Sequence, residues 1–185
     1  MVVAMLKSVQ CTVIGDGFVG KSCLVQKIAD GQFHEEYIAT LKDDYNTNIL
    51  INGDHYDLSI TDIAGEHEDL SSVEIPDVYI VCFSLADKNS MDSVEDFWVP
   101  KVRALRRDVP IVLVGTQTDV RKSLHNGHIT TEKGQRLAKR LGVDYYVECS
   151  AKENSGIQET FLKAVQAKVR NDKRKLNIIK RILDR

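Results

Sequence analysis

The chain has 185 residues, of which 43% are hydrophobic and 28% charged, a composition typical of one globular domain with a substantial core. No apolar run is long enough to span a membrane, and the N-terminus lacks a signal-peptide pattern. The net charge of −2 divides into +6 for residues 168–185 and −8 for the rest, so the basic body that nucleic-acid binding requires is missing. The four cysteines form no Cys-x-x-Cys pair, which disfavours a disulfide framework or a zinc site and predicts reduced thiols in a cytoplasmic protein.

Strand and helix patterns alternate along the chain. The predicted strands are Val9–Ile14, Tyr45–Ile51, His55–Thr61, Val78–Ser84, Ile111–Gly115 and Tyr145–Cys149. The predicted helices are Lys21–Ala29, Ser90–Arg107, Thr131–Leu141 and a long one from Ile157, opened by a capping box of Ser155 and Gln158. Asn52-Gly53 predicts a type I′ hairpin, so that strand pair is antiparallel, while the intervening helices make the other pairs parallel. We therefore predict one α/β domain with its ligands at the carboxyl ends of the strands.

The first motif is a phosphate-binding loop. Residues 15–22, Gly-Asp-Gly-Phe-Val-Gly-Lys-Ser, fit G-x-x-x-x-G-K-[ST] and lie between a predicted strand and a predicted helix. Glycines let backbone N–H groups turn toward phosphate oxygens, and the start of the helix adds the positive end of its dipole. Lys21 is expected to reach the β- and γ-phosphates, and the Ser22 hydroxyl to bind Mg²⁺. A chance match in a glycine-rich turn is the alternative.

Three further motifs end later strands. Asp62-Ile63-Ala64-Gly65 is common in ordinary turns, but after a phosphate loop it predicts an acidic Mg²⁺ partner and a backbone N–H for the γ-phosphate. In residues 116–119, Thr-Gln-Thr-Asp, the Asp119 carboxylate can accept hydrogen bonds from N1 and N2 of guanine, whereas a helix cap is the alternative. In residues 148–152, Glu-Cys-Ser-Ala-Lys, the N–H of Ala151 can donate to guanine O6.

With these four motifs in this order, residues Leu6 to Val169 resemble a Ras-superfamily small GTPase, and most closely its Rho/Rac branch. Rho-like details include Thr116-Gln117, Phe97-Trp98-Val99-Pro100 and Glu148-Cys149-Ser150-Ala151. The resemblance implies a three-layer small G-domain with a six-stranded sheet, five strands parallel and one antiparallel, and helices on both faces. It implies a monomer that binds GTP, GDP and Mg²⁺ and hydrolyses GTP. We expect this domain over residues 1–170 and a basic helical extension or tail over 171–185.

The resemblance also implies roles for individual residues. Phe33 would lie edge-on to the base, Tyr37 would close over the phosphates, and Thr40 would bind Mg²⁺ only in the GTP state. The implied metal ligands are Ser22, Thr40 and Asp62, and the implied catalytic residues are Lys21, Thr40, Gly65 and Glu66. The implied nucleotide-binding residues are Gly17, Phe18, Val19, Gly20, Lys21, Ser22, Cys23, Phe33, Tyr37, Thr40, Gly65, Thr116, Gln117, Asp119, Ser150, Ala151 and Lys152.

Glu66 departs from the family, which normally has a glutamine here to orient the attacking water. Two like charges about 4 Å apart repel by about 4 kcal/mol at an effective dielectric constant near 20, so a carboxylate should turn away from the γ-phosphate or take up a proton. We therefore expect slow hydrolysis. The alternatives are a pseudo-GTPase, a GTP-bound interaction module with negligible turnover, and a phosphate-loop kinase or ATPase, which Asp119 disfavours.

The expected partner surfaces also depart from the family. Regulators and effectors are expected to contact switch I (34–43) and switch II (62–77), but Lys42 replaces a phenylalanine, and Leu70 and Val73 are the remaining apolar contacts of switch II. Phe18 is bulky where a small residue is usual, and packs beside the nucleotide, contacts a partner or covers the loop. The C-terminus has no C-a-a-X cysteine. Its basic tail, with Leu176, Ile179 and Leu183 on one helical face, either lies on an anionic membrane or is a solvated helix end.

Overall fold

The computed structural model of the chain describes residues 7–33, 42–51, 53–63, 70, 74–123 and 128–183. The strands are β1 (Lys7–Ile14), β2 (Lys42–Ile51), β3 (Asp54–Ile63), β4 (Val78–Ser84), β5 (Ile111–Thr116) and β6 (Tyr145–Glu148). The helical elements are α1 (Lys21–Ala29), α2 (Lys88–Ser93), η2 (Val94–Trp98), α3 (Val99–Leu105), α4 (Thr118–Ser123), α5 (Thr131–Leu141) and α6 (Ile157–Leu183).

The strands form one six-stranded sheet in the order β2-β3-β1-β4-β5-β6. Only the β2–β3 pair is antiparallel, and Ile51 lies opposite Asp54 across a two-residue connection in which Gly53 has a φ of 87°. This positive φ is the one that a type I′ hairpin requires, and Asn52 lies outside the described residues. The predicted α/β class, with a mostly parallel sheet and one antiparallel strand, is confirmed.

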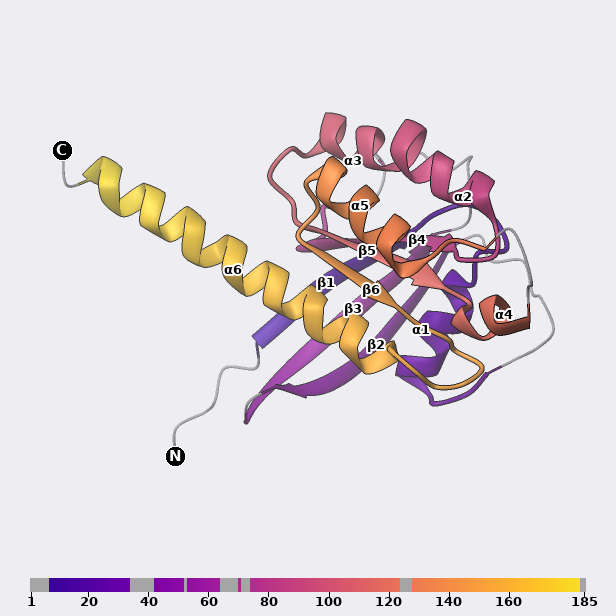
Figure 1. Cartoon of the computed structure of the whole chain (residues 1–185). Coiled ribbons are helices and arrows are strands. Elements are labelled where there is room, and N and C mark those ends of the chain that lie inside the picture. The colour runs from indigo at the N-terminus through magenta and orange to yellow at the C-terminus, as the bar shows by residue number, and fades with distance from the viewer. Residues whose placement is uncertain are drawn as a thin grey trace.

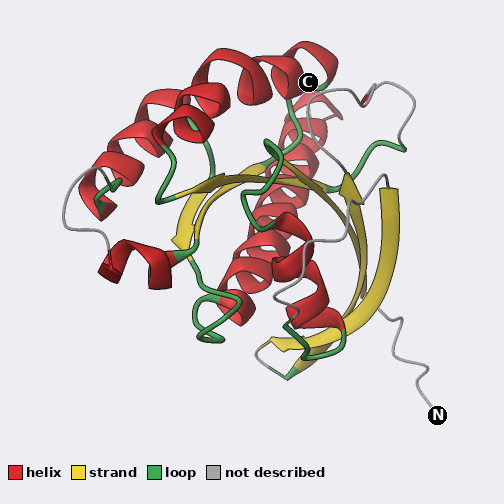
Figure 2. Ribbon diagram, turned by 90° about the vertical axis from the view of Figure 1, so that its right-hand side faces the viewer, coloured by secondary structure: helices red, strands yellow, loops and turns green. Residues whose placement is uncertain are grey.

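Helices cover both faces of this sheet (Figure 2). On one face, α1 and α6 bury Leu24, Val25 and Phe161 against β1 and β3. On the other face, the segment from α2 to α3 and helix α5 bury Trp98, Val102 and Leu137 against β4 and β5. Strand β4 is buried along its whole length, as its continuously apolar sequence predicts for a strand covered on both faces.

The predicted helix over Ser90–Arg107 begins earlier, at Lys88, and is not a regular α-helix throughout. Asp87 caps it by accepting a hydrogen bond from the N–H of Asn89 at 2.9 Å. Its middle part, η2, is a π-helical turn in which the N–H of Val99 donates to the carbonyl of Val94. Pro100 follows directly and has no N–H for an i−4 carbonyl, which accounts for the irregular turn at this point.

Helix α6 has 27 residues and continues past the edge of the sheet, so its last turns project from the body (Figure 1). Asn171 and Lys175 hold it there, the first by donating to the carbonyl of Asp108 at 3.1 Å and the second by an ion pair with the Asp108 carboxylate at 2.7 Å. Beyond this point its apolar side chains are exposed. Among the described residues, no helix combines the length and the apolar character needed to span a bilayer.

Several predicted boundaries were wrong. The capping box of Ser155 and Gln158 does not open α6, because Gly156 provides the first helical acceptor and the backbone of Ser155 is paired with Ser150. Strand β6 ends at Glu148 rather than Cys149, and α4 was not predicted. Leu70 is buried in the core, with 3% of its surface exposed, so it is not the surface contact expected in switch II.

Candidate functional site

The predicted phosphate loop connects β1 to α1. Gly15 packs so closely on β4 that a Cβ atom there would lie 2.2 Å from the carbonyl oxygen of Cys82. Gly20, with a φ of 89°, occupies the N-cap of α1, and no side chain caps that helix. The first turn of α1 contains no acidic residue. A Cβ atom on Gly17 would meet nothing within 4 Å, so the loop opens to free space at that point. The loop therefore presents uncapped backbone N–H groups and no negative side chain at the start of the helix.

Lys21 is buried, and its ammonium group lies inside the loop. Its Nζ donates to the carbonyl oxygens of Gly15 at 2.9 Å and Asp16 at 2.7 Å. Burial lowers the pKa of Lys21, although nearby anionic groups, among them Asp62 and Asp16, oppose this shift. The lysine is thus held next to the loop by neutral carbonyl groups, which the oxygens of an anionic ligand could replace.

Asp62 is the most unusual group in this region. In the register of β1 and β3 it lies opposite Val13, two residues before the loop begins. Its side chain is completely buried, and neither carboxylate oxygen has a hydrogen-bond partner among the described residues. Burial raises the pKa of this carboxyl, while Ser22 and Lys21 nearby lower it. The Ser22 hydroxyl approaches this carboxylate and lowers its pKa, but neither oxygen has a partner in normal hydrogen-bond geometry, which is unfavourable for a buried charge. A cation held between Asp62 and Ser22 would satisfy it.

The end of β5 contacts the phosphate loop. Thr116 Oγ1 lies between the carbonyl oxygens of Val19 and Phe83 and can donate to one of them at a time. The Gln117 amide donates to the carbonyl of Phe18 at 3.2 Å, and its oxygen accepts a hydrogen bond from the Ser84 hydroxyl at 2.6 Å. Both Phe18 and Gln117 have positive φ angles, 63° and 61°. These contacts join the predicted base-binding strand end to the predicted phosphate loop.

A cavity of about 470 Å³ lies beside this contact. It is lined by residues from four segments of the chain: Gly20, Cys23, Leu24, Phe33, Thr116, Gln117, Asp119, Val120, Cys149, Ala151 and Lys152. The Asp119 carboxylate is oriented by the Ser150 hydroxyl, which donates to its Oδ1 at 2.5 Å. Ser150 Oγ in turn accepts a hydrogen bond from the N–H of Glu153 at 3.0 Å. The cavity thus combines apolar walls with one fixed carboxylate, as expected of a site that selects a polar, planar ligand.

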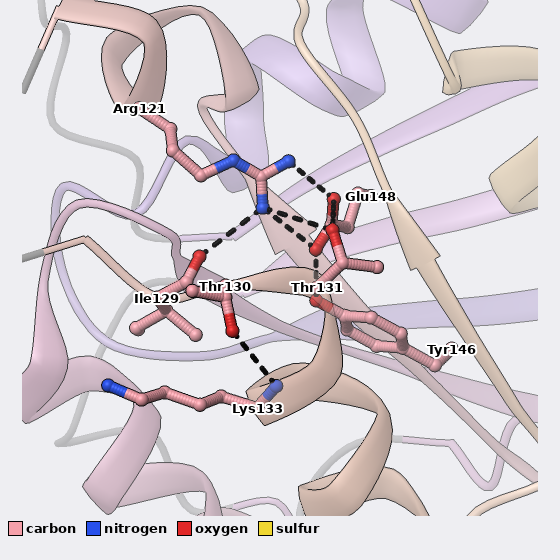
Figure 3. Close-up of polar contacts among 7 residues, drawn as sticks. All are labelled: Arg121, Ile129, Thr130, Thr131, Lys133, Tyr146 and Glu148. Carbon is pink, nitrogen blue, oxygen red and sulfur yellow. Dashed lines mark hydrogen bonds and ion pairs between the residues drawn. The ribbon is translucent and has the colours of Figure 1, made fainter.

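An ion-pair network joins α4 and α5 to strand β6 (Figure 3). Arg121 of α4 makes two parallel hydrogen bonds to Glu148 of β6, at 3.0 and 2.7 Å. The hydroxyl groups of Tyr146 and Thr131 donate to the same carboxylate at 2.7 and 3.0 Å. Burial would raise the pKa of Glu148, but these donors lower it overall. The network fixes α4 and α5 to the strand end that precedes Ser150 and Ala151.

The remaining predicted residues are partly outside the described chain. Tyr37, Thr40, Gly65 and Glu66 lie there. Gly17, Phe18, Val19, Ser22 and the cavity-lining residues are brought to one edge of the sheet, as expected. Leu24, Val120 and Cys149 also line the cavity but were not predicted, because an apolar residue in or next to a motif carries no signal of its own. The four cysteines are free; burial raises the pKa of Cys11 and Cys149 to about 12, so both are thiols, and Cys23 is half-buried.

Comparison with known proteins agrees with this arrangement. The model of the Ras family matches residues 10–170, and the chain therefore belongs to the Ras family, whose members are small GTPases that bind GTP and GDP. Among its relatives is the Ras-like GTP-binding protein RhoL of Drosophila melanogaster. The two are 34% identical over 171 residues, which cover 90% of each chain.

Proposed function

We propose that this protein is a guanine-nucleotide switch of the Rho type, which binds GTP and GDP with Mg²⁺ and hydrolyses GTP slowly. The observation that carries the proposal is the cavity in which Ser150 orients the Asp119 carboxylate. A fixed carboxylate accepts hydrogen bonds from N1 and N2 of guanine, whereas adenine offers no such pair of donors. The phosphate loop, joined to this cavity through Gln117 and Thr116, would receive the phosphates of the same ligand.

Each residue of the loop would have a separate task. Lys21 would exchange its carbonyl partners for phosphate oxygens, and the N–H groups of residues 17–23 would bind the remaining oxygens. Mg²⁺ would be held by Ser22, Asp62 and, in the GTP state, Thr40, together with phosphate oxygens. The described residues contain no cluster of three or more His, Cys, Asp or Glu side chains suited to a metal ion, so the nucleotide itself would complete this site.

Switching would depend on segments that contact the γ-phosphate. Thr40 and the N–H of Gly65 would bind it, and the loss of these contacts on hydrolysis would release switch I (34–43) and switch II (62–77). We propose these two segments as the surfaces for regulators and effectors of a monomeric protein. Phe18, with 73% of its surface exposed on the phosphate loop, would be a further apolar contact for these partners.

Replacing Glu66 with glutamine is expected to accelerate GTP hydrolysis about tenfold, because a neutral amide can orient the attacking water without repelling the γ-phosphate. The measurement is single-turnover hydrolysis of bound GTP, with the bound nucleotide identified by chromatography. Asp92→Asn, which changes an exposed carboxylate of α2, serves as the matched control and should retain the wild-type rate.

The same experiment separates the switch from a pseudo-GTPase. A wild-type rate equal to or above that of Glu66→Gln would contradict slow hydrolysis and make Glu66 a tolerated replacement. Retention of GTP over many hours by the wild type, with turnover only in the variant, would favour a GTP-bound interaction module.

We also propose that the projecting part of α6 rests on an anionic membrane surface, with the domain (1–170) in the cytoplasm and residues 171–185 as its extension. Five apolar side chains of this part are more than half exposed: Leu176, Ile178, Ile179, Ile182 and Leu183. At 100° per residue they occupy one side of the helix, together with Lys175, which is paired with Asp108, and Lys173, Arg174, Lys180 and Arg181 occupy the opposite side. An apolar stripe opposite a basic face is the pattern of helices that lie in the membrane interface.

Changing Ile179 and Leu183 together to glutamine is expected to reduce sedimentation with phosphatidylserine-containing vesicles about a hundredfold in partition coefficient, because each exposed side chain contributes about 1.5 kcal/mol or more when buried. Leu50→Gln, which removes an equally exposed apolar side chain from β2, is the matched control. Equal sedimentation of wild type and the double variant would indicate a solvated helix end. Equal binding of the wild type to neutral and anionic vesicles would contradict the anionic surface.

A further inference from the structure

Trp98 contacts the phosphate loop from a part of the chain that none of the four motifs includes. Its indole N–H donates to Oδ1 of Asp16 at 2.6 Å, across 82 residues of sequence. The ring is buried, with 1% of its surface exposed, and lies in the core together with Val94, Val99 and Val102. A donor on a buried, rigid ring can hold its acceptor in one position, and a bond to a carboxylate is stronger than one between neutral groups.

Asp16 connects this hydrogen bond to the lysine of the loop. Its carboxylate accepts from Trp98, while its backbone carbonyl accepts from Nζ of Lys21 at 2.7 Å. The carbonyl of the preceding Gly15 is the second acceptor of Lys21. A rotation of the Asp16 backbone would therefore move both the N–H groups of the loop and the position of the lysine.

The local structure of the helix orients the indole. Trp98 is the last residue of the π-helical turn η2, and Pro100 follows two residues later. Phe97 packs edge-on against it, with 5.0 Å between the ring centroids, and the Lys101 ammonium lies 5.6 Å from the centroid of the Trp98 ring. π-Helical turns shift the direction of the following side chains relative to a regular helix, and they occur frequently at functional sites.

We propose that Trp98 is a positioning residue for the phosphate loop: its indole N–H fixes Asp16, and loss of this hydrogen bond accelerates release of the bound guanine nucleotide. The helical segment from α2 to α3 would then control how long the nucleotide stays bound, although none of its side chains lines the described cavity. This inference rests on the proposed nucleotide site.

The test is the release rate of fluorescent GDP from the full chain in Mg²⁺, measured for Trp98→Phe, Asp16→Ala and the double variant. Each single variant is expected to release GDP about tenfold faster than the wild type, because each removes one charge-assisted hydrogen bond. The double variant should be no faster than either single one, because both changes remove the same bond. Asp16→Asn keeps a side-chain oxygen that can accept the hydrogen bond of the indole, so it should release GDP more slowly than Asp16→Ala. This difference should disappear when Trp98 is also changed to phenylalanine.

Loss of core packing would give a different result. Val102→Ala, a buried change in the same helical segment, should lower the melting temperature without accelerating release. Additive effects of Trp98→Phe and Asp16→Ala, or unchanged release in Trp98→Phe, would overturn the inference. A wild-type protein that retains no GDP would instead contradict the proposed function. In that case, amide hydrogen exchange of residues 15–20 decides the inference: faster exchange in Trp98→Phe supports it, and equal exchange overturns it.

Discussion

Replacing Asp119 with alanine is expected to weaken the binding of GDP and GTP about a thousandfold. The variant leaves N1 and N2 of a bound guanine without their acceptor, and hydrogen bonds to a charged group contribute about 1.5 to 3 kcal/mol each. The fold should persist, because Ser150 keeps its hydrogen bond from the N–H of Glu153 and its backbone pairing with Ser155. The measurement is competition of unlabelled nucleotides with fluorescent GDP, together with a thermal unfolding curve for each protein.

Two controls make this result specific. Asp92→Ala removes an exposed carboxylate whose distance to Lys88 is 3.7 Å, and it should bind GDP as the wild type does. ATP should not compete in the wild type. Binding of GDP by Asp119→Ala within threefold of the wild type, or equal competition by ATP, would contradict guanine selection by this carboxylate and would favour a phosphate-loop kinase or ATPase.

Changing Asp62 to asparagine is expected to stabilise the protein without Mg²⁺ and to abolish its response to Mg²⁺. Both oxygens of this carboxylate are buried without hydrogen-bond partners among the described residues, so removal of the charge should raise the free energy of unfolding by about 1 kcal/mol, or the Tm by about 3 °C. In Mg²⁺, the wild type should gain stability and hold GDP longer, whereas the variant should do neither. Both effects can be measured on GDP-loaded protein in EDTA and in Mg²⁺.

Asp43→Asn is the matched control for this experiment. Asp43 lies directly opposite Asp62 in the β2–β3 pair but is exposed, and its charge raises the pKa of Asp62. The Asp43 variant should keep the full response to Mg²⁺. A wild-type response in Asp62→Asn would mean that this carboxylate does not contribute to a metal site.

Without Mg²⁺, the buried carboxyl of Asp62 should make the folded protein less stable as the pH rises. Burial raises the folded-state pKa of Asp62 above its ordinary value of 3.8, so without Mg²⁺ the folded protein holds this proton more tightly than the unfolded chain does. The contribution of Asp62 to stability should therefore fall as pH rises from 3.8 through the raised pKa. Mg²⁺ favours the ionised form, so its stabilising effect should grow over the same range. Asp62→Asn should remove both dependences.

Much of the fold and of the candidate site could be predicted because the signals were local. The hairpin could be predicted from Asn52-Gly53 alone, and the buried strands from their continuous apolar runs. Asp119 and Ala151 follow different strands, β5 and β6, but the carboxyl ends of parallel strands share one edge of the sheet, so motifs at those ends must meet.

The errors concern interactions that leave no local signal. Arg121 and Glu148 are 27 residues apart, so no local pattern indicates their ion pair. Helix α4 has only six residues, too few to show a helical repeat of apolar residues. The contact between Trp98 and Asp16 spans still more of the chain. The capping box failed because the backbone pairing of Ser150 with Ser155 uses the residue that would have capped the helix. Tertiary contacts thus replaced a local preference at the start of α6.

The length of α6 has a consequence for orientation. Its first residue, Ile157, follows the turn that carries Ser150 and Ala151, and its last described residue, Leu183, is about 40 Å away at 1.5 Å per residue. Because no glycine or proline interrupts it, the helix connects the turn of Ser150 and Ala151 to its exposed end without a hinge. A surface that holds the exposed end would therefore also set the angle at which the nucleotide site and both switch segments face their partners, which a flexible tether of the same length would leave free.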